Sequence, residues 1–486
     1  MIKQIGLWTL IVNVQLLFAQ TNPNEFITKK AALQDISILK TSIFEIHPSI
    51  FRYTSKREFN DEFTEASNQV ADSIKIIEFA NLIVPIISKI HCGHTFPLIS
   101  YINSTTKAIP LDVKIINERL FVLGNYSLRN EPKPGAELIE INGIRVTNLL
   151  NNIRNKEIGD GFVVTTKDRK IERFFKWYFA MYFNQPDSFR IKFRLDENPE
   201  IRVATLAALK DSEIEKNKGV QNKLKPLDFR IDKANDLAVL RISSFMANQV
   251  KKKHKQNFKK IVRRAFAEIG ENKIDNLVID IRDNTGGMAF APPFLYTYLG
   301  TKDFKFKNKL LFRHGYRFSN PKYLNRSKLN DWFNRHFMKK INDTTYEWTL
   351  HNNTRKLYAI KRNVFKGQLF VLQNGMTASG AAEFATLVHH NHRGTIVGEE
   401  SGGDYNGING YDRTYLRLPN SKIGVLIAGY RSIMPWDEKQ YLGHGVPVDY
   451  EVHSQITDLL NGQDAELDFV YNLIKKQVTE GTVHNK

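Results

Sequence analysis

A serine at a sharp junction is the first candidate for chemistry in this chain of 486 residues. Ser379 lies in the stretch VLQNGMTASGAAEF (371–384), where an apolar run typical of a buried strand leads through an Asn-Gly turn into helix-forming residues. A hydroxyl at the start of a helix lies beside backbone N–H groups that have no partner in the helix and can bind an oxyanion. The same position is also where a serine commonly caps a helix. The stretch therefore predicts either a nucleophile or a simple cap.

A second turn, rich in glycine, follows another apolar run. The stretch VIDIRDNTGG (278–287) ends in Gly286 and Gly287. Paired glycines at the carboxyl end of a strand can form a nest of N–H groups that binds an anion, and open α/β sheets bind ligands at such ends. A tight β–α turn would explain the glycines equally well. Two turns of this kind, one of them carrying a serine, suggest a nucleophile that faces an oxyanion hole.

The elements that must position these turns alternate between strand and helix from about residue 229. Before them we expect a secretory signal peptide, a helical domain, a small α+β module with a hairpin at Asn142-Gly143, and a charged linker. The predicted segments are 1–20 (signal peptide), 21–100 (helical domain), 105–205 (module), 206–228 (linker), 229–460 (core with a basic insertion at 301–366) and 461–486 (C-terminal helix and tail).

Composition limits the cellular compartments and the binding partners that we expect for this protein. The apolar run after the first lysine is too short for a membrane anchor, and polar residues follow it, which favours a signal peptide over a core helix. A single cysteine allows no internal disulfide, so we expect an exported bacterial protein of the periplasm or cell surface. The basic insertion carries 17 Lys and Arg against 4 Asp and Glu, a net charge of +13. It is either a solvated surface or a site for anionic lipid or acidic peptides, since no nucleic-acid-binding motif accompanies it.

Blocks in the second half of the chain resemble one known family, the S41 peptidases, which comprise the C-terminal processing proteases and their tricorn-like relatives. The resemblance implies an α/β fold with a ClpP/crotonase-like core of ββα units and Ser379 as the nucleophile. It also implies an oxyanion hole made by the N–H of Gly380 with Gly286 or Gly287. The segment PKPGAELIEINGIRV (132–146) is similar to the PDZ-like module of such proteases. The blocks that carry the family resemblance are LVIDIRDNTGG (277–287), VLQNGMTASGAAEFATLV (371–388), TIVGEESGG (395–403) and GHGVPVDYEV (443–452).

The same resemblance assigns the general base. Processing proteases use a lysine in the turn after the VGE strand, but Gly403 and Asp404 occupy that turn here, so a Ser-Lys dyad is not expected. The tricorn-like branch uses the histidine of a D-G-H-T element, and HCGHT (91–95) resembles it with Cys92 in place of the aspartate. His94 then becomes the base, a role that suits an imidazole near neutral pH. The alternative is a histidine packed at a domain boundary.

A third group should orient the imidazole and stabilise its cation. The family places a glutamate shortly before its GVxPD block, which makes Glu438 the first candidate and Asp437 the second. The acid could also be missing, since Leu442 stands where relatives often carry one. No cofactor fingerprint is present. We expect no catalytic metal, although zinc ligands could be drawn from His91 with His94 or from the histidines at 389–392.

The main hypothesis is an exported serine endopeptidase, a hydrolase that acts through an acyl-enzyme on protein or peptide substrates. The module at 105–205 would add a substrate's C-terminal segment as a strand, and the basic insertion would attract acidic peptides. The alternative is a non-catalytic ligand- or peptide-binding protein on the same fold, as in the retinoid-binding repeats that resemble this family. A third possibility is hydrolysis of a non-peptide ester. The oligomeric state is not specified by the sequence.

Overall fold

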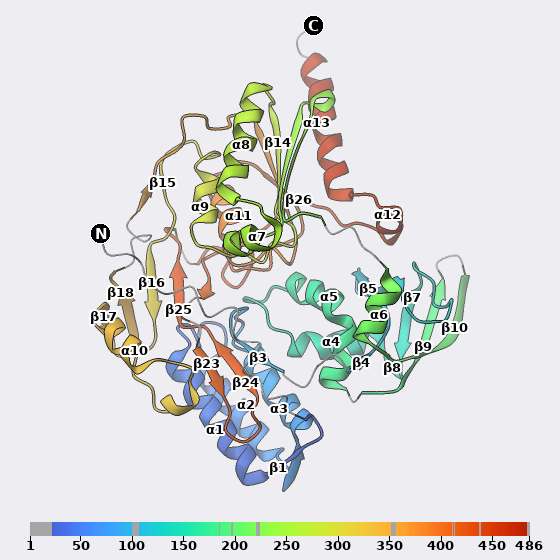
Figure 1. The fold of residues 1–486 in the computed structure, drawn as a ribbon, viewed down its shortest axis with the longest axis vertical. Helices are drawn as coiled ribbons and strands as arrows, with labels where there is room; N and C mark the ends of the chain where they lie inside the picture. Colours follow the sequence, from blue (N-terminus) through green and yellow to red (C-terminus); the bar gives the residue numbers. More distant parts are fainter. Residues whose placement is uncertain are drawn as a thin grey trace.

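The computed structural model describes residues 22–483 except 100–105, 184, 196–197, 220–223, 351–355, 411, 413 and 437–438. The predicted signal peptide therefore lies outside the described residues. Figure 1 shows the N-terminal helices at one end of an elongated molecule, the α/β core at the other, and the module at 105–205 on one side between them. Within the described ranges, no helix combines the length and the apolar character needed to span a membrane.

A six-stranded sheet forms the centre of the core, in the order β12-β13-β14-β20-β21-β26. Only β12 is antiparallel to its neighbour. Side chains of α8, α9 and α11 pack on one face and those of α13 on the other, so these strands are apolar on both faces. The elements are β12 (Leu227–Asp232), β13 (Leu237–Ile242), α7 (Ala247–His254), α8 (Phe258–Glu271), β14 (Asn276–Asp280), α9 (Ala291–Tyr296), β20 (Gln368–Gln373), α11 (Gly380–His390), β21 (Thr395–Gly398), β26 (Tyr450–Glu451), α12 (Ile456–Leu460) and α13 (Ala465–Val483).

The N-terminal helices share their hydrophobic core with a hairpin from the far end of the chain. Leu416, Val425 and Ile427 of this β23–β24 hairpin pack among the helices, and β3 adds to β24 as a third strand. The hairpin was predicted, but as part of the α/β core. The elements are β1 (Phe26–Thr28), α1 (Lys29–Ile46), α2 (Lys56–Asn68), β2 (Ser73–Lys75), α3 (Ile76–Ser88), β3 (Phe96–Leu98), β23 (Thr414–Arg417) and β24 (Gly424–Ile427).

The module is built around one sheet, in the order β10-β9-β7-β6-β5 with β8 paired to β7, and the helices α4 and α5. The predicted hairpin is present, with positive φ at both Asn142 and Gly143 between β7 and β8. The predicted linker is folded in its first half, where β11 pairs with β4 and α6 buries Ile214. The elements are β4 (Lys107–Ala108), β5 (Leu111–Ile116), β6 (Arg119–Asn125), β7 (Glu137–Ile141), β8 (Ile144–Arg145), α4 (Val146–Lys156), α5 (Thr165–Tyr182), β9 (Ser188–Leu195), β10 (Asn198–Ala207), β11 (Leu209–Lys210) and α6 (Asp211–Lys218).

The basic insertion is attached to the core by a sheet and by a buried ion pair. Its β16 pairs with β25 in the sheet β17-β18-β16-β25-β22. Lys307 Nζ lies 2.9 Å from Glu383 Oε1 in α11, and both side chains are buried. This pair fixes the insertion against the helix that begins after Ser379. The elements are β15 (Phe304–Lys305), β16 (Lys309–Phe312), η3 (Pro321–Tyr323), α10 (Lys328–Arg335), β17 (Met338–Asn342), β18 (Thr345–Trp348), β19 (Leu357–Tyr358), β22 (Asn409–Gly410) and β25 (Tyr430–Ile433).

Candidate active site

Ser379 stands between β20 and α11 with φ 54° and ψ −128°, a backbone conformation that L-residues rarely adopt. It occupies the N-cap position, but its side chain makes no capping hydrogen bond. Strain of this kind costs about 1–3 kcal/mol and is concentrated at functional sites. The structure therefore does not support the reading of Ser379 as a simple helix cap, because the half-buried hydroxyl is turned away from its own helix.

The two turns predicted to meet are joined by hydrogen bonds. β14 and β20 are parallel neighbours, so both turns leave the same edge of the sheet. The Ala378 N–H donates to the Asn284 carbonyl oxygen (3.0 Å), and Thr377 Oγ1 donates to the Ile281 carbonyl oxygen (3.0 Å). The Asn284 side chain in turn donates to the Ile242 carbonyl oxygen of β13 (2.8 Å). Three neighbouring strands thus hold the serine turn in place.

The three candidate glycines of the oxyanion hole lie together beside Ser379. A Cβ built on Gly380 would lie 3.7 Å from the Gly287 nitrogen and 3.9 Å from Gly286 Cα. The Gly286 N–H already donates to Asn284 Oδ1 (2.9 Å). Gly286 therefore fits the site through its missing side chain, and the N–H groups of Gly287 and Gly380 are the candidate donors to an oxyanion.

We expect Gly286→Ala to lower peptidase or esterase activity at least about tenfold, because its Cβ would lie 2.7 Å from both the Gly380 nitrogen and Ser379 Cβ. Gly143→Ala is the matched control, since Gly143 also has positive φ but nothing within 4 Å of a built Cβ. Gly143→Ala should lose about 1 kcal/mol of stability from backbone strain, and Gly286→Ala should lose more because its Cβ also clashes with the serine turn. Activity per folded molecule, with thermal unfolding measured in parallel, separates them, and equal activities would contradict the placement of Gly286.

His94 reaches the serine from the other end of the molecule. Its loop follows α3 and leads into β3, and Thr95 Oγ1 accepts a hydrogen bond from the Ala428 N–H (2.9 Å) just after β24. His94 Nε2 lies 3.3 Å from Ser379 Oγ, although 285 positions separate the two residues. Packing of the β23–β24 hairpin under the N-terminal helices therefore brings an imidazole within hydrogen-bond reach of the hydroxyl.

An aspartate that the sequence analysis did not single out lies beside this histidine. Asp160 comes from the loop between α4 and α5 of the module, and its Oδ1 accepts a hydrogen bond from the Gly93 N–H (2.6 Å). Cys92, His94 and Asp160 each place one side-chain N, S or O atom within 4.8 Å of the others. The module is also tied to the same loop by the Gly161 N–H, which donates to the His91 carbonyl oxygen (3.0 Å). Asp160 stands between two glycines in IGDGF, a pattern that indicates only a turn.

Burial sets the protonation of this cluster. Desolvation raises the pKa of Asp160 to about 6, against the opposing effect of the Gly93 N–H. Desolvation, with Asp160 next in size, raises the pKa of the Cys92 thiol to about 12. A thiol held protonated is a poor nucleophile and a poor metal ligand. The three side chains therefore have a suitable composition for a metal ion, but the electrostatics favour a proton-handling role.

The remaining predicted site residues have different outcomes. Glu438 and Asp437 lie outside the described residues. Asp404, which occupies the turn of the absent lysine, is buried, accepts a hydrogen bond from Tyr53 Oη (2.8 Å) and lies 3.6 Å from Arg431. Gly403 adjoins the serine turn, since its built Cβ would lie 3.0 Å from the Ser379 nitrogen.

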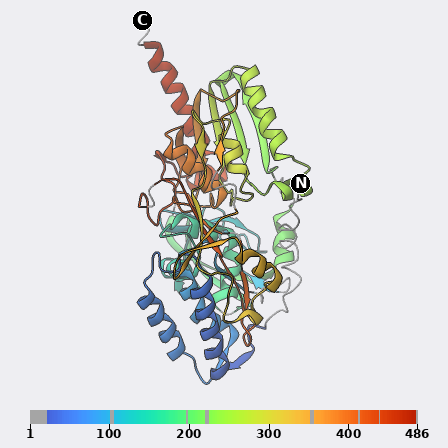
Figure 2. The same ribbon diagram turned by 90° about the vertical axis from the view of Figure 1, so that its left-hand side faces the viewer.

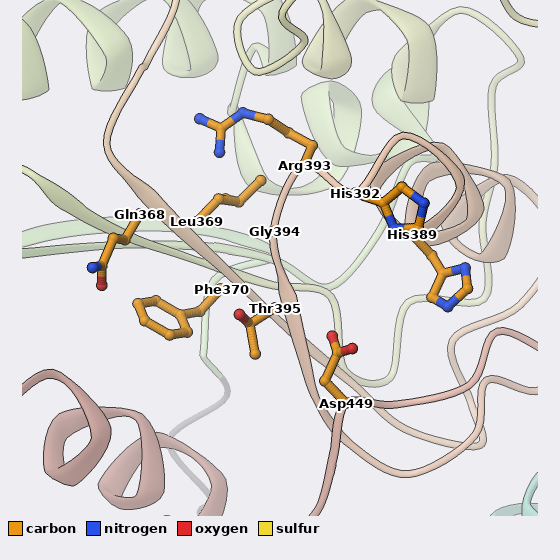
Figure 3. Close-up of a pocket in the computed structure, with 9 residues that line it drawn as sticks. All are labelled: Gln368, Leu369, Phe370, His389, His392, Arg393, Gly394, Thr395 and Asp449. Atoms are coloured by element: carbon orange, nitrogen blue, oxygen red, sulfur yellow. The ribbon is translucent and has the colours of Figure 1, made fainter. Parts of the chain in front are cut away.

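The histidines at the end of α11 lie apart from this site. Figure 3 shows His389 and His392 at a cavity of about 460 Å³ whose lining also includes Arg393 and Asp449. Arg393 donates to the carbonyl oxygens of Leu299 and Phe365, and Asp449 accepts from the Ile396 N–H. The cavity lies at the C-terminal end of the helix that begins after Ser379, and its charged groups are engaged in structure, so it does not serve the serine.

Comparisons with known proteins bear on the fold. Residues 236–452 match the model of Peptidase family S41. The fold is similar to mature CPAF complexed with lactacystin, with a TM-score of 0.64 and 13% identity over 94% of this chain and 99% of that chain. A mutant of CPAF gives a TM-score of 0.65 and 14% identity over 93% and 98% of the two chains. A search of curated proteins finds no match. The likeness confirms the predicted α/β fold class.

Proposed function

We propose, from the match of residues 236–452 to the model of peptidase family S41, that the chain is an exported serine-type endopeptidase with Ser379 as nucleophile. The observation that carries the proposal is the 3.3 Å approach of His94 Nε2 to Ser379 Oγ. A nucleophile and a base within hydrogen-bond reach are the minimum requirement for activating a serine hydroxyl. The strained backbone of Ser379 supports a role in presenting the hydroxyl to a substrate. The adjacent glycine N–H groups would form the oxyanion hole.

In the proposed mechanism, Ser379 Oγ attacks the carbonyl carbon of the scissile peptide bond while His94 Nε2 accepts the hydroxyl proton. The negative charge that develops on the carbonyl oxygen is stabilised by the N–H groups of Gly287 and Gly380. His94 then protonates the leaving amine, and the amine departs from the acyl-enzyme. A water molecule, deprotonated by His94, hydrolyses the ester and regenerates the serine.

Asp160 is the acid that we assign to the imidazole in place of Glu438. A carboxylate within 4.8 Å stabilises the imidazolium that forms at both tetrahedral steps. Because Asp160 belongs to the module, the module would contribute to catalysis as well as to substrate binding. Its sheet ends in β5 and β10, and β10 exposes Ile201 and Val203, which suits the addition of a peptide strand.

The test is covalent labelling of the purified chain with a fluorophosphonate probe, followed by peptide mapping. We expect one stoichiometric label on Ser379 and hydrolysis of a denatured protein substrate that is lost on labelling. An unlabelled Ser379 would instead favour the non-catalytic binding protein. Labelling together with turnover of small esters but of no peptide would favour the ester hydrolase.

A further inference from the structure

Helix α10 of the basic insertion exposes its large apolar side chains and buries an acidic one, which is the reverse of an ordinary surface helix. Asp331 is 7% exposed, whereas Leu329, Trp332 and Phe333 are 72%, 56% and 54% exposed. These three residues are spaced i, i+3 and i+4, so they share one face of the helix. We call them the α10 stripe. A helix that buries its acid and exposes its largest apolar side chains presents a surface for a partner.

The polar side of α10 fixes this orientation. Arg326 Nη2 lies 2.7 Å from Asp331 Oδ1, and the same guanidinium donates to Thr414 Oγ1 (2.7 Å) in β23. Arg335 Nη2 donates to the Tyr316 carbonyl oxygen (2.8 Å). The helix is thus anchored through charged groups, which leaves the α10 stripe on the outside. Figure 1 shows α10 with β17 and β18 at the margin of the molecule, and Figure 2 turns this side toward the viewer.

The charge around the stripe indicates the kind of partner. Lys328 precedes it, and Lys339 and Lys340 follow in β17, all exposed. They belong to the basic insertion, whose net charge is +13. A second copy of this chain would bring these like charges together, which opposes self-association through the same face. A nucleic acid would engage the lysines and leave Leu329 and Phe333 unused.

We propose that the α10 stripe docks the protein on an anionic membrane surface. Trp, Phe and Leu side chains on one helix face, flanked by lysines, are the composition of helices that lie in the lipid headgroup region. The apolar side chains would enter the headgroup–acyl boundary and the lysines would contact anionic headgroups. The inference goes beyond the proposed peptidase activity and does not depend on it.

The experiment is co-sedimentation of the mature full-length chain with vesicles of phosphatidylcholine alone or with about a third phosphatidylglycerol. We expect binding to the anionic vesicles that is at least about tenfold tighter than to the neutral ones and that weakens as salt is raised. Leu329→Ser/Trp332→Ser should lower the binding to anionic vesicles at least about tenfold, and Lys339→Gln/Lys340→Gln should lower it and reduce its salt dependence.

Phe174→Ser is the matched control, because Phe174 is an exposed aromatic residue of α5, outside the insertion, and its loss should leave vesicle binding unchanged. Unfolding curves of all variants exclude misfolding as the cause. Equal vesicle binding by the wild type and Leu329→Ser/Trp332→Ser would overturn the proposal. So would a wild-type dimer in solution that the same double variant converts to monomer, since the occupant of the stripe would then be a second copy.

Discussion

Replacing Ser379 with alanine is expected to lower kcat/KM for a peptide substrate by at least about 10³-fold, and His94→Gln by a similar factor. The two side chains act as one unit, since the hydroxyl is weakly nucleophilic without the base and the base has no proton to take without the hydroxyl. The double variant should therefore be about as active as either single one, because the losses of such a pair are not additive. The measurement is the initial rate on a fluorogenic peptide, with unfolding curves to check that each variant is folded.

Two substitutions control for this result. Ser67→Ala removes a serine of α2 whose hydroxyl donates to the Phe63 carbonyl oxygen of the same helix, and His336→Gln removes an exposed histidine after α10. Both should retain full activity. If Ser379→Ala kept more than about a tenth of the wild-type rate, the nucleophile would have to be another group and the 3.3 Å contact would have no catalytic meaning.

The core and the two turns were predictable because their patterns are local. The apolar runs that became β14 and β20, and the glycines and serine that follow them, identify buried strands and tight turns within a few residues. Parallel pairing then brings the turns to one edge of the sheet. His94 required more, since no local pattern links it to Ser379. It was assigned from the resemblance of HCGHT to a family element, and the structure brings the two side chains together.

What could not be predicted depends on contacts between distant segments. Asp160 approaches His94 because the α4–α5 loop packs against the loop after α3, and the Gly93 N–H fixes the carboxylate there. The packing of the β23–β24 hairpin under the N-terminal helices also depends on contacts between distant segments. Its alternating apolar residues predict one buried face but do not identify the surface that covers it. The inverted face of α10 depends on Arg326, which makes a buried position favourable for Asp331.

Asp160→Asn is expected to lower kcat/KM by about 10- to 100-fold at pH 8. A unit charge at about 5 Å is worth about 3 kcal/mol at an effective dielectric constant near 20, which corresponds to about two orders of magnitude in rate. The ratio of wild-type to variant activity should fall toward one as the pH is lowered from 8 to 5. The reason is that the pKa of Asp160 is about 6, so the wild-type carboxyl becomes neutral over this range. A ratio that stays constant with pH would contradict the assignment.

The same variant should be more stable than the wild type at neutral pH. Burial raises the pKa of Asp160 from 3.8 to about 6, so the folded protein binds this proton more tightly than the unfolded chain, and stability is lost as the pH rises from about 4 to 6. The difference amounts to about 3 kcal/mol at pH 7.5, and the amide avoids that loss while its oxygen can still accept from the Gly93 N–H. Asp35→Asn is the control, because this buried α1 carboxylate accepts hydrogen bonds from Ser421 and Asn420. Asp35→Asn should lower the free energy of unfolding and leave the activity unchanged. If Asp160 had only a structural role, Asp160→Asn would lower both the free energy of unfolding and the activity.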